Sequence, residues 1–452
     1  MFTSIDLFSG PGGLCTGLKW AGIKPLIAVE MSDWTVKTYG ASHDADILVL
    51  GDYLEGTLEN EAEYFLPNDK TLLIHGDITK ITNELIDKIL NERFGVNTVD
   101  IVTGGAPCES FSMAGQRRDD DERNNLFLNL ERIAKHVDAS MVLFENVKGL
   151  FSKKLDGKAG KMYEMICDEF ERANNKGVSF KLASRDQGTV LLKASDYGVP
   201  QNRERIFLVG VNSKYHAEFS YPEKTHGEGR RYPYVTVGDA ILDLPKVGVK
   251  EGEEEVEFIP EIKDSFSIQR KEFLQIVSGE KFGLPEHLKD KKNKLNSHIG
   301  PGHKPPMINR LANILPGEGM KQAAERLINN GQEDVRNNCF PKKLYAARNR
   351  RLVADKPSFT VTSHCLDEMV HPILNRSITP REAARLQSFP DWYQLQGPYV
   401  KFHSDPQQDR YEQMGDAIPP LLAYALGVKI VETLNEITFQ NLELKEVVNN
   451  HG

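Results

Sequence analysis

Cys108 is the residue whose surroundings point most directly to chemistry. It lies in "TGGAPCESFS" (103–112), directly after a proline and at the end of an apolar run. A lone cysteine in a chain of this length is more often a small buried hydrophobe. Here the neighbours are glycine, alanine and serine, which are too small to form a core around the thiol. The stretch therefore favours an accessible nucleophile.

A glycine-rich loop, "FSGPGG" (8–13), follows the first apolar run of the chain. Glycines let a ligand approach the backbone closely, and a following helix would offer its N-terminus. The loop departs from the dinucleotide fingerprint G-x-G-x-x-G, because counting from Gly10 places Cys15 where the last glycine belongs. This disfavours a nicotinamide dehydrogenase. A turn with packing duties only is the alternative interpretation.

Three acidic residues end other apolar runs. Glu30 could accept hydrogen bonds from a ribose, and Asp77 could hold an exocyclic amine, although either can be an ordinary solvated strand end. Glu145 ends the run after the one that leads to Cys108. In the usual strand order, thiol, carboxylate and glycine loop converge at one edge of a sheet.

The elements that position these residues are short β-rich runs alternating with helical stretches. This pattern predicts an α/β fold with a doubly wound, mostly parallel sheet. In such a sheet, ligands collect at the carboxyl ends of the strands. The expected strands are 4–8, 25–30, 71–77, 99–105, 141–146, 188–195 and 205–211.

The whole chain has 452 residues, of which 40% are hydrophobic, enough for two or three domains with a sizeable core. Its N-terminus has no basic start followed by an apolar stretch, and no eighteen apolar residues run together, which disfavours export and membrane spanning. The five cysteines are odd in number and show no metal or disulfide spacing. A reducing cytoplasm and no structural metal are expected.

The alternating pattern breaks after residue 211. Residues 251–280 carry three Lys/Arg against nine Asp/Glu, whereas 281–355 carry fifteen against seven, a net charge of +8 in a chain of −9. "RNRRL" (348–352) alone would usually be a solvated basic face, but for 281–355 as a whole we favour contact with nucleic-acid phosphates. The segment 419–434 is expected to be an amphipathic helix that returns to the first domain.

Six segments together resemble the DNA cytosine-5 methyltransferases, in that family's order. The resemblance extends along the chain, with a long variable region between the fourth and fifth segments. They are "DLFSGPGG" (6–13), "GGAPCESFS" (104–112), "ENVKG" (145–149), "YGVPQNRERIFLVG" (197–210), "SITPREAARLQSFP" (377–390) and "QMGDAIPP" (413–420).

The resemblance implies S-adenosylmethionine as cofactor and a cytosine flipped out of double-stranded DNA as substrate. Carbon 5 of cytosine is a poor nucleophile, so Cys108 would add to carbon 6, and Glu145 would share a proton with N3. Arg205 would hold the cytosine O2, with Arg203 supporting the loop. The sequence does not identify the base that removes the carbon-5 proton. The helix "REAARLQ" (381–387) is expected to be structural, with Arg381, Glu382 and Arg385 forming local pairs.

The resemblance also implies which residues bind the cofactor, and each is assigned to the position of this sequence that matches the family's motif. Glu109 replaces the family's usual glutamine, and its charge would raise the cysteine pKa. Met31 replaces a frequent tryptophan, and Asp416 replaces an asparagine. The expected cofactor residues are Phe8, Gly10, Gly12, Gly13, Glu30, Met31, Asp77, Ile78, Pro107, Leu126 and Asp416.

The resemblance implies a Rossmann-like class I methyltransferase domain over 1–212, completed by 408–452. A smaller target-recognition domain and hinge would occupy 213–407. We expect a bacterial cytoplasmic monomer with double-stranded DNA as its partner. The sequence does not decide whether a cognate restriction endonuclease acts on the same DNA sequence or the enzyme acts alone. An RNA cytosine-5 methyltransferase and a catalytically inactive DNA-binding relative are the alternatives. Intact Cys108, Glu145 and Arg205 disfavour the second of these.

Overall fold

The computed structural model describes residues 1–106, 126–155, 157–401, 405 and 407–450, with side chains up to residue 442. It divides the chain into two compact units. The first comprises Met1–Lys193, Glu204–Glu223 and Leu422–Gly452, and the second comprises Ala194–Arg203 and Lys224–Leu421. These bounds differ from the expected domain division, which stays a prediction.

The first unit is built on a nine-stranded sheet of order β10-β12-β6-β5-β1-β2-β4-β3, with β9 pairing β12. The strands from β6 to β3 in this order are parallel, and β12 pairs antiparallel with β6, β9 and β10. This confirms a mostly parallel sheet. The strands are β1 (Phe2–Leu7), β2 (Ile23–Glu30), β3 (Asp46–Val49), β4 (Leu72–His75), β5 (Ile101–Gly105), β6 (Met141–Val147), β9 (Phe180–Leu182), β10 (Leu191–Lys193) and β12 (Glu204–Asn212).

The expected strand at 188–195 is wrong in its first half. The chain forms α8 (Gln187–Val190) there, because the Asp186 side chain accepts a hydrogen bond from the Thr189 N–H at 2.8 Å and caps the turn. Only β10 follows as a strand. The short strands β3 and β9 were not expected, since runs of four and three residues give no clear alternation.

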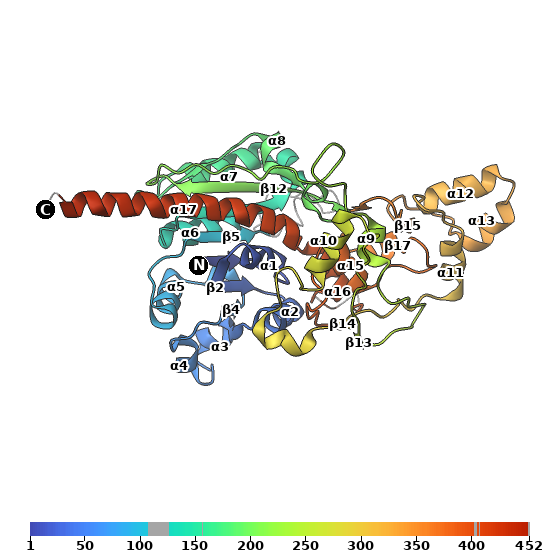
Figure 1. The fold of residues 1–452 in the computed structure, drawn as a ribbon, viewed down its shortest axis with the longest axis horizontal. Coiled ribbons are helices and arrows are strands. Elements are labelled where there is room, and N and C mark those ends of the chain that lie inside the picture. The colour runs from blue at the N-terminus through green and yellow to red at the C-terminus, as the bar shows by residue number, and fades with distance from the viewer. Residues whose placement is uncertain (107–125, 156, 402–404, 406, 451–452) are drawn as a thin grey trace. The chain divides into compact units, whose positions relative to one another are not determined.

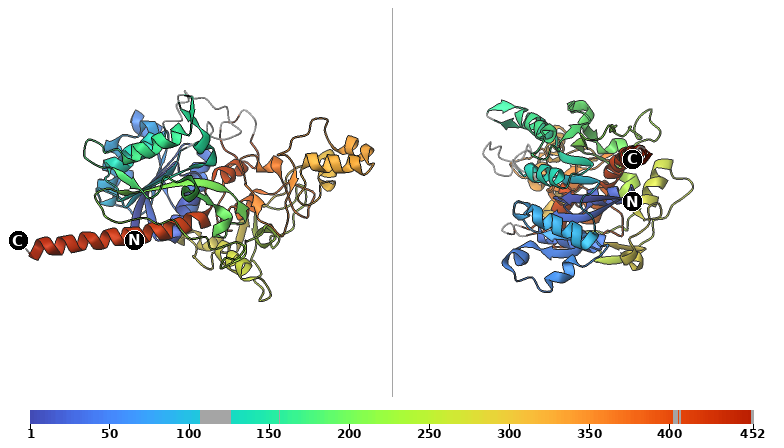
Figure 2. Two further views of the ribbon diagram at one scale, coloured as in Figure 1. Left: turned by 90° about the horizontal axis from the view of Figure 1, so that it is seen from above. Right: turned by 90° about the vertical axis from the view of Figure 1, so that its left-hand side faces the viewer.

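Helices cover both faces of the sheet, and the strand alternation decides which side chains they meet. Ile27 and Val29 join a core cluster with α5 (Asn83–Lys88), α6 (Phe127–His136) and α7 (Lys161–Glu171). Ala28, between them, joins another cluster with α1 (Gly13–Trp20) and α2 (Asp33–His43). The layers can be followed in Figure 1 and in the two further views of Figure 2. Also present are α3 (Leu50–Glu55), α4 (Glu61–Phe65), β7 (Lys154–Leu155) and β8 (Lys158–Ala159).

The long helix α17 (Pro420–Asn450) covers all but the first residue of 419–434, the segment expected to be an amphipathic helix. A Cβ at Gly427 would lie 2.7 Å from the Ala21 Cβ, so α17 packs closely against the end of α1. The helical stretch Arg410–Leu442 is the one candidate in the described chain that is long and apolar enough to cross a membrane, and 61% of its apolar window is buried, as in a core helix.

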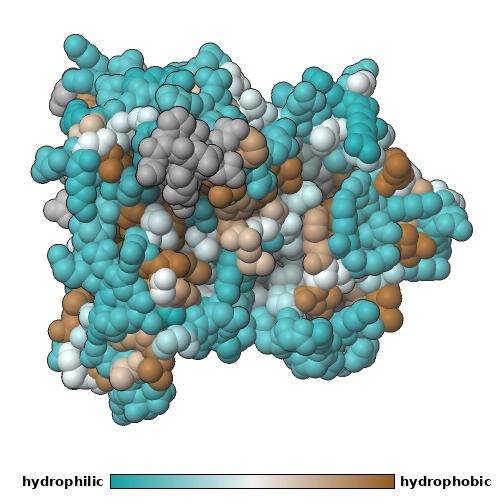
Figure 3. All heavy atoms as spheres, turned by 60° about the vertical axis from the view of Figure 1, so that its left-hand side comes forward, coloured by the Kyte–Doolittle hydropathy of each residue, from teal (hydrophilic) through white to brown (hydrophobic). Residues whose placement is uncertain are grey.

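On the face shown in Figure 3, hydrophilic side chains predominate.

The second unit consists of short helices and two-stranded ladders. β11 (Gln201–Asn202) pairs with β16 (Ser358–Phe359), β13 (Glu255–Glu257) with β14 (Lys294–Asn296), and β15 (Arg350–Arg351) with β17 (Met369–Val370). The helices are α9 (Val237–Ile241), α10 (Ile268–Val277), α11 (Pro305–Ala312), α12 (Met320–Asn329), α13 (Glu333–Cys339), α14 (Cys365–Glu368), α15 (Pro380–Leu386) and α16 (Arg410–Asp416).

Helix α15 has the expected structural role, but its charged residues do not form the local pairs that were expected. Arg381 is fully buried and donates to the Asn296, Pro390 and Tyr393 carbonyl oxygens. Glu382 pairs with Arg376 at 2.7 Å. Arg385 pairs with Asp243 and Asp391. Buried charges need partners on several sides, so α15 ties distant segments of the second unit together.

The interpretation of "RNRRL" as a solvated face is wrong for Arg351. Its side chain is buried, and its guanidinium donates to the carbonyl oxygens of Ile314, Leu311, His371 and Leu374. Arg348 is exposed. The sequence could not distinguish these two arginines, because the local sequence does not show whether an arginine side chain is buried and anchors a loop or projects into solvent.

Candidate active site

The loop from Phe8 to Gly13 joins β1 to α1 and carries three left-handed residues. The φ angles are 55° at Phe8, 55° at Gly10 and 94° at Gly12. Gly12 precedes the first residue of α1, and its N–H donates to the Ser9 carbonyl at 3.1 Å. Apart from its chain neighbours, a Cβ at Gly10 would meet no atom of the described residues within 4 Å. Space therefore lies open beside the loop, where a ligand can approach its backbone.

The Glu30 carboxylate, at the end of β2, holds this loop. One oxygen accepts the Gly10 N–H at 2.9 Å, and the other accepts the N–H groups of Met31 at 2.8 Å and Ser32 at 2.9 Å. Burial raises the pKa of Glu30, and the three N–H donors oppose that rise. The carboxylate oxygens can accept further bonds. The structure thus brings Gly10 and Glu30 together.

Two polar residues of this region were missed by the sequence reasoning. Asp6 in β1 is buried, and its Oδ1 accepts the Thr103 hydroxyl at 2.8 Å, whereas its Oδ2 has no hydrogen-bond partner in the described structure. The Ser9 hydroxyl is also buried without a partner there. Burial raises the pKa of Asp6 to about 7. A carboxylate inside the apolar run "SIDLF" was the signal that could have identified Asp6.

The ends of β2 and β4 lie side by side, with Glu30 in register with His75. His75 connects the two strand ends, because its Nε2 lies 3.0 Å from Asp33 and 3.3 Å from the Met31 carbonyl. The expected adenine-contacting residues are at these ends. Met31 is 67% exposed, Ile78 is buried, and Asp77 accepts the Thr79 N–H at 2.9 Å.

The expected catalytic carboxylate, Glu145, forms an ion pair with Arg205. Its Oε1 lies 3.1 Å from the Arg205 Nε, and both side chains are largely buried. Glu145 is in register with Gly105 of the neighbouring strand β5. A Cβ at Gly105 would lie 2.6 Å from Glu145 Oε2, so only glycine leaves room for the carboxylate in this position.

Three further predicted residues lie in the sequence between β5 and α6. Cys108 and Pro107 lie outside the described residues, which end at Ala106 on this side. On the other side, Leu126 directly precedes α6 and packs against the main core.

Arg203 and Asp416 belong to the second unit. Arg203 is buried, and its Nη1 donates to the Val361 carbonyl at 2.8 Å, which ties its segment to the strand region of β16. Asp416, the last residue of α16, accepts a hydrogen bond from the Gln408 amide at 2.6 Å.

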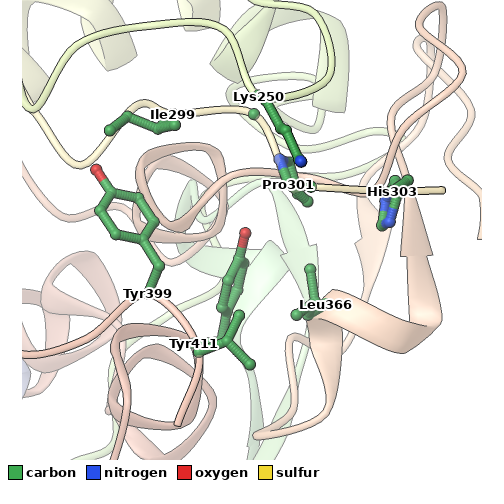
Figure 4. A pocket seen from close by; sticks show the side chains of 10 residues that line it. Lys250, Ile299, Pro301, His303, Leu366, Tyr399 and Tyr411 are labelled. Atoms are coloured by element: carbon green, nitrogen blue, oxygen red, sulfur yellow. The ribbon is translucent and has the colours of Figure 1, made fainter.

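A pocket of about 400 Å³ also lies in the second unit. Figure 4 shows the side chains of Tyr399, Tyr411, Lys250 and His303 around it. Its lining includes none of the predicted cofactor or catalytic residues that the structure describes.

The mostly parallel sheet with helices on both faces defines an α/β protein, and comparison with known proteins narrows the class. The sequence model of the C-5 cytosine-specific DNA methylases matches residues 2–61 and 58–432. The Type II methyltransferase M.DdeI of Desulfomicrobium norvegicum is 29% identical over 449 residues, covering 98% of this chain and 92% of that protein. M.AquIA of Picosynechococcus sp. is 34% identical over 256 residues, covering 53% of this chain and 88% of its own.

A solved structure shows the same fold. A protein encoded within a prophage in E. coli superposes with a TM-score of 0.67 at 24% identity, covering 96% of this chain and 100% of its own. Because the family match extends over most of the sequence, the chain belongs to the C-5 cytosine-specific DNA methylase family. It is a DNA (cytosine-5-)-methyltransferase.

Proposed function

We propose that the chain methylates cytosine within a specific duplex sequence, with S-adenosylmethionine at the Phe8–Gly13 loop and a covalent bond through Cys108. The single observation that carries this assignment is the Glu145–Arg205 pair, next to Gly105 on the strand that leads toward Cys108. The Glu145 carboxylate and the Arg205 guanidinium, which are expected to hold the same cytosine ring, come from different strands, and their Oε1 and Nε atoms lie 3.1 Å apart.

The described residues fit the proposed cofactor. The open space beside Gly10 admits a ligand, and Ser9 Oγ and Asp6 Oδ2 are buried polar atoms for which the described structure provides no partner. Glu30 would bind the ribose. Met31, Asp77 and Ile78 would surround the adenine, while Phe8, Gly12, Gly13, Pro107, Leu126 and Asp416 would complete the site. When bound, S-adenosylmethionine supplies an electrophilic methyl group.

The residues of the chain activate the cytosine. The Cys108 thiolate adds to carbon 6, which moves electron density to carbon 5 and N3. Glu145 shares a proton with N3, and Arg205 binds O2, so that the negative charge on the ring is stabilised. Arg203 would support this segment. After the methyl group reaches carbon 5, a base removes the carbon-5 proton and the Cys108 sulfur leaves.

The ion pair gives Arg205 a second part in this scheme. An arginine beside a carboxylate favours the charged form of that carboxylate. Glu145, however, must carry a proton in order to share it with N3 of the cytosine. When cytosine enters, its O2 would take a place on the guanidinium, and Glu145 would turn from Arg205 toward N3.

The partners follow from the family and from local charge. Double-stranded DNA is the substrate, and we assign phosphate contacts to the basic segment 281–355. Relatives such as M.DdeI carry the name Type II methyltransferase, which supports a cognate restriction endonuclease for this chain as well. The enzyme would act as a monomer in the bacterial cytoplasm.

Methyl transfer from labelled S-adenosylmethionine to duplex DNA and to transfer RNA, followed by sequencing of 5-methylcytosine, tests this proposal. We expect label in DNA only, at one cytosine of a fixed sequence. Label in transfer RNA would favour the RNA enzyme, and no label in either would favour an inactive relative.

A further inference from the structure

The loop over residues 341–349, which we call the basic loop, joins α13 to β15. The stretch 335–354 around it contains six Lys/Arg and no Asp/Glu. Within the loop, Lys342, Lys343, Tyr345 and Arg348 are exposed. Positive charge is thus concentrated on one short segment of an acidic chain.

The basic loop is held at both ends. Phe340, just before it, is buried in the core cluster formed by α11, α12 and Val370 of β17. These elements lie together in Figure 1. At the other end, Asn349 is buried and donates twice to the Asp367 carbonyl, from its backbone N–H at 2.9 Å and its side-chain amide at 3.0 Å.

Hydrogen bonds also order the tip of the loop. The Arg348 N–H donates to the Tyr345 carbonyl at 3.3 Å, and the Arg348 carbonyl accepts the Met320 N–H at the start of α12. The side chains between them, Ala346 and Ala347, are small and exposed. The tip therefore has a defined backbone with room for another molecule to approach.

Tyr345 lies between two cations. Its ring is 45% exposed, with the Lys343 Nζ at 5.0 Å and the Arg348 Cζ at 5.2 Å from the ring centroid. Arg348 also faces Asp367, with 3.4 Å between Nη2 and Oδ2. The ring and the carboxylate together orient a guanidinium that is otherwise in solvent.

We propose that the basic loop reads the DNA sequence, and that Arg348 hydrogen-bonds the edge of a guanine in the major groove. Arginine presents a planar fork that matches O6 and N7 of guanine. Reading requires a side chain held in place by its neighbours on a supported backbone, and Tyr345 and Asp367 hold this one. Lys342 and Lys343 would contact phosphates, which position the loop without specifying sequence. This inference rests on the proposed methylation of DNA.

The experiment is methylation of a DNA library with randomised positions around the modified cytosine, read by 5-methylcytosine sequencing. The variants are Arg348→Ala and Arg348→Lys. Arg231→Ala is the matched control, because Arg231 is an exposed arginine over a tyrosine ring in the same unit but outside the loop. Arg348→Lys keeps the positive charge and so guards against a variant that fails to fold.

For both Arg348 variants we expect that one position of the DNA site, where the wild-type enzyme requires guanine, will accept any base. The preference for the original sequence should fall by roughly 5- to 150-fold, as for loss of one bidentate base contact. The control should keep the wild-type sequence. An unchanged sequence with equally weakened methylation everywhere would make Arg348 a phosphate contact and overturn the inference. Absence of 5-methylcytosine with the wild-type enzyme would contradict the proposed function instead.

Discussion

The Nε of Arg205 lies 3.1 Å from Oε1 of Glu145, although the two residues are sixty positions apart in the sequence. The antiparallel register of β12 on β6 pairs Arg205 with Val147 and Phe207 with Glu145. The two charged side chains are therefore diagonal neighbours on one face of the sheet, a spacing that long side chains can bridge. This geometry places the two proposed cytosine-binding groups together.

Replacing Gly105 by alanine should disturb this arrangement. The new Cβ would lie 2.6 Å from Glu145 Oε2, so the carboxylate must move. Misplacement of a catalytic group can cost about 100-fold in rate, and we expect a loss of that order in single-turnover methylation while S-adenosylmethionine binding survives. Gly51→Ala is the control, because outside its own helix backbone and chain neighbours no described atom lies within 4 Å of its added Cβ. Equal activities of the two variants would show that the position of Glu145 is not critical.

Glu145→Gln should slow methylation severely. The amide can hydrogen-bond N3 but cannot share a proton with it, so the loss should be about 10²–10⁴-fold, as for removal of a general acid. Pre-steady-state methyl transfer with saturating DNA and cofactor measures it. Unchanged turnover would assign the proton to another group.

Asp6→Asn should change how stability depends on pH. Burial raises the pKa of Asp6 from 3.8 to about 7, so the folded state binds a proton that the unfolded state has released between these values. The wild-type fold should therefore lose stability as pH rises from about 4 to about 7, by a few kcal/mol at most, and the variant should not show this loss. Urea unfolding of both proteins across this range measures the difference, and parallel profiles would contradict the assignment.

Neutralising Lys342 and Lys343 together should weaken binding to all DNA sequences alike. Each neutralised phosphate releases condensed counterion and contributes a slope of roughly −0.9 in log K against log salt. The double alanine variant should therefore show a flatter salt dependence with an unchanged methylated sequence. If the slope did not change, the lysines would be ordinary solvated charges. If the methylated sequence changed, they would be reading bases.

The parallel sheet could be predicted from sequence because most of its buried strands are nearly continuous apolar runs. The same pattern failed at 188–195, where one side-chain cap at Asp186 favours a helical turn over a strand. For Glu30 and Asp77, the sequence could predict only that each lies at the end of a strand. Contacts such as the hydrogen bond from the Gly10 N–H to Glu30 depend on how the strands pair in the folded chain.

Charged residues were the hardest to interpret. Arg348 and Arg351 are three positions apart in one basic motif, yet one is in solvent and the other is enclosed by carbonyl oxygens. Their difference is set by the packing of α11 and β17, which lie elsewhere in the sequence. Asp6 was missed for the same reason, because its pKa is raised by burial, which exists only in the folded chain.

Reaction of the enzyme with DNA that carries 5-fluorocytosine at the target position tests the central claim most directly. Fluorine cannot leave carbon 5 as a proton does, so the bond between Cys108 and carbon 6 should persist after methyl transfer. We predict an adduct that survives denaturation, maps to Cys108 by mass spectrometry, requires S-adenosylmethionine and is absent from Cys108→Ser. If no such adduct formed while ordinary DNA was methylated, or if Cys108→Ser turned over normally, the covalent mechanism through Cys108 would be contradicted.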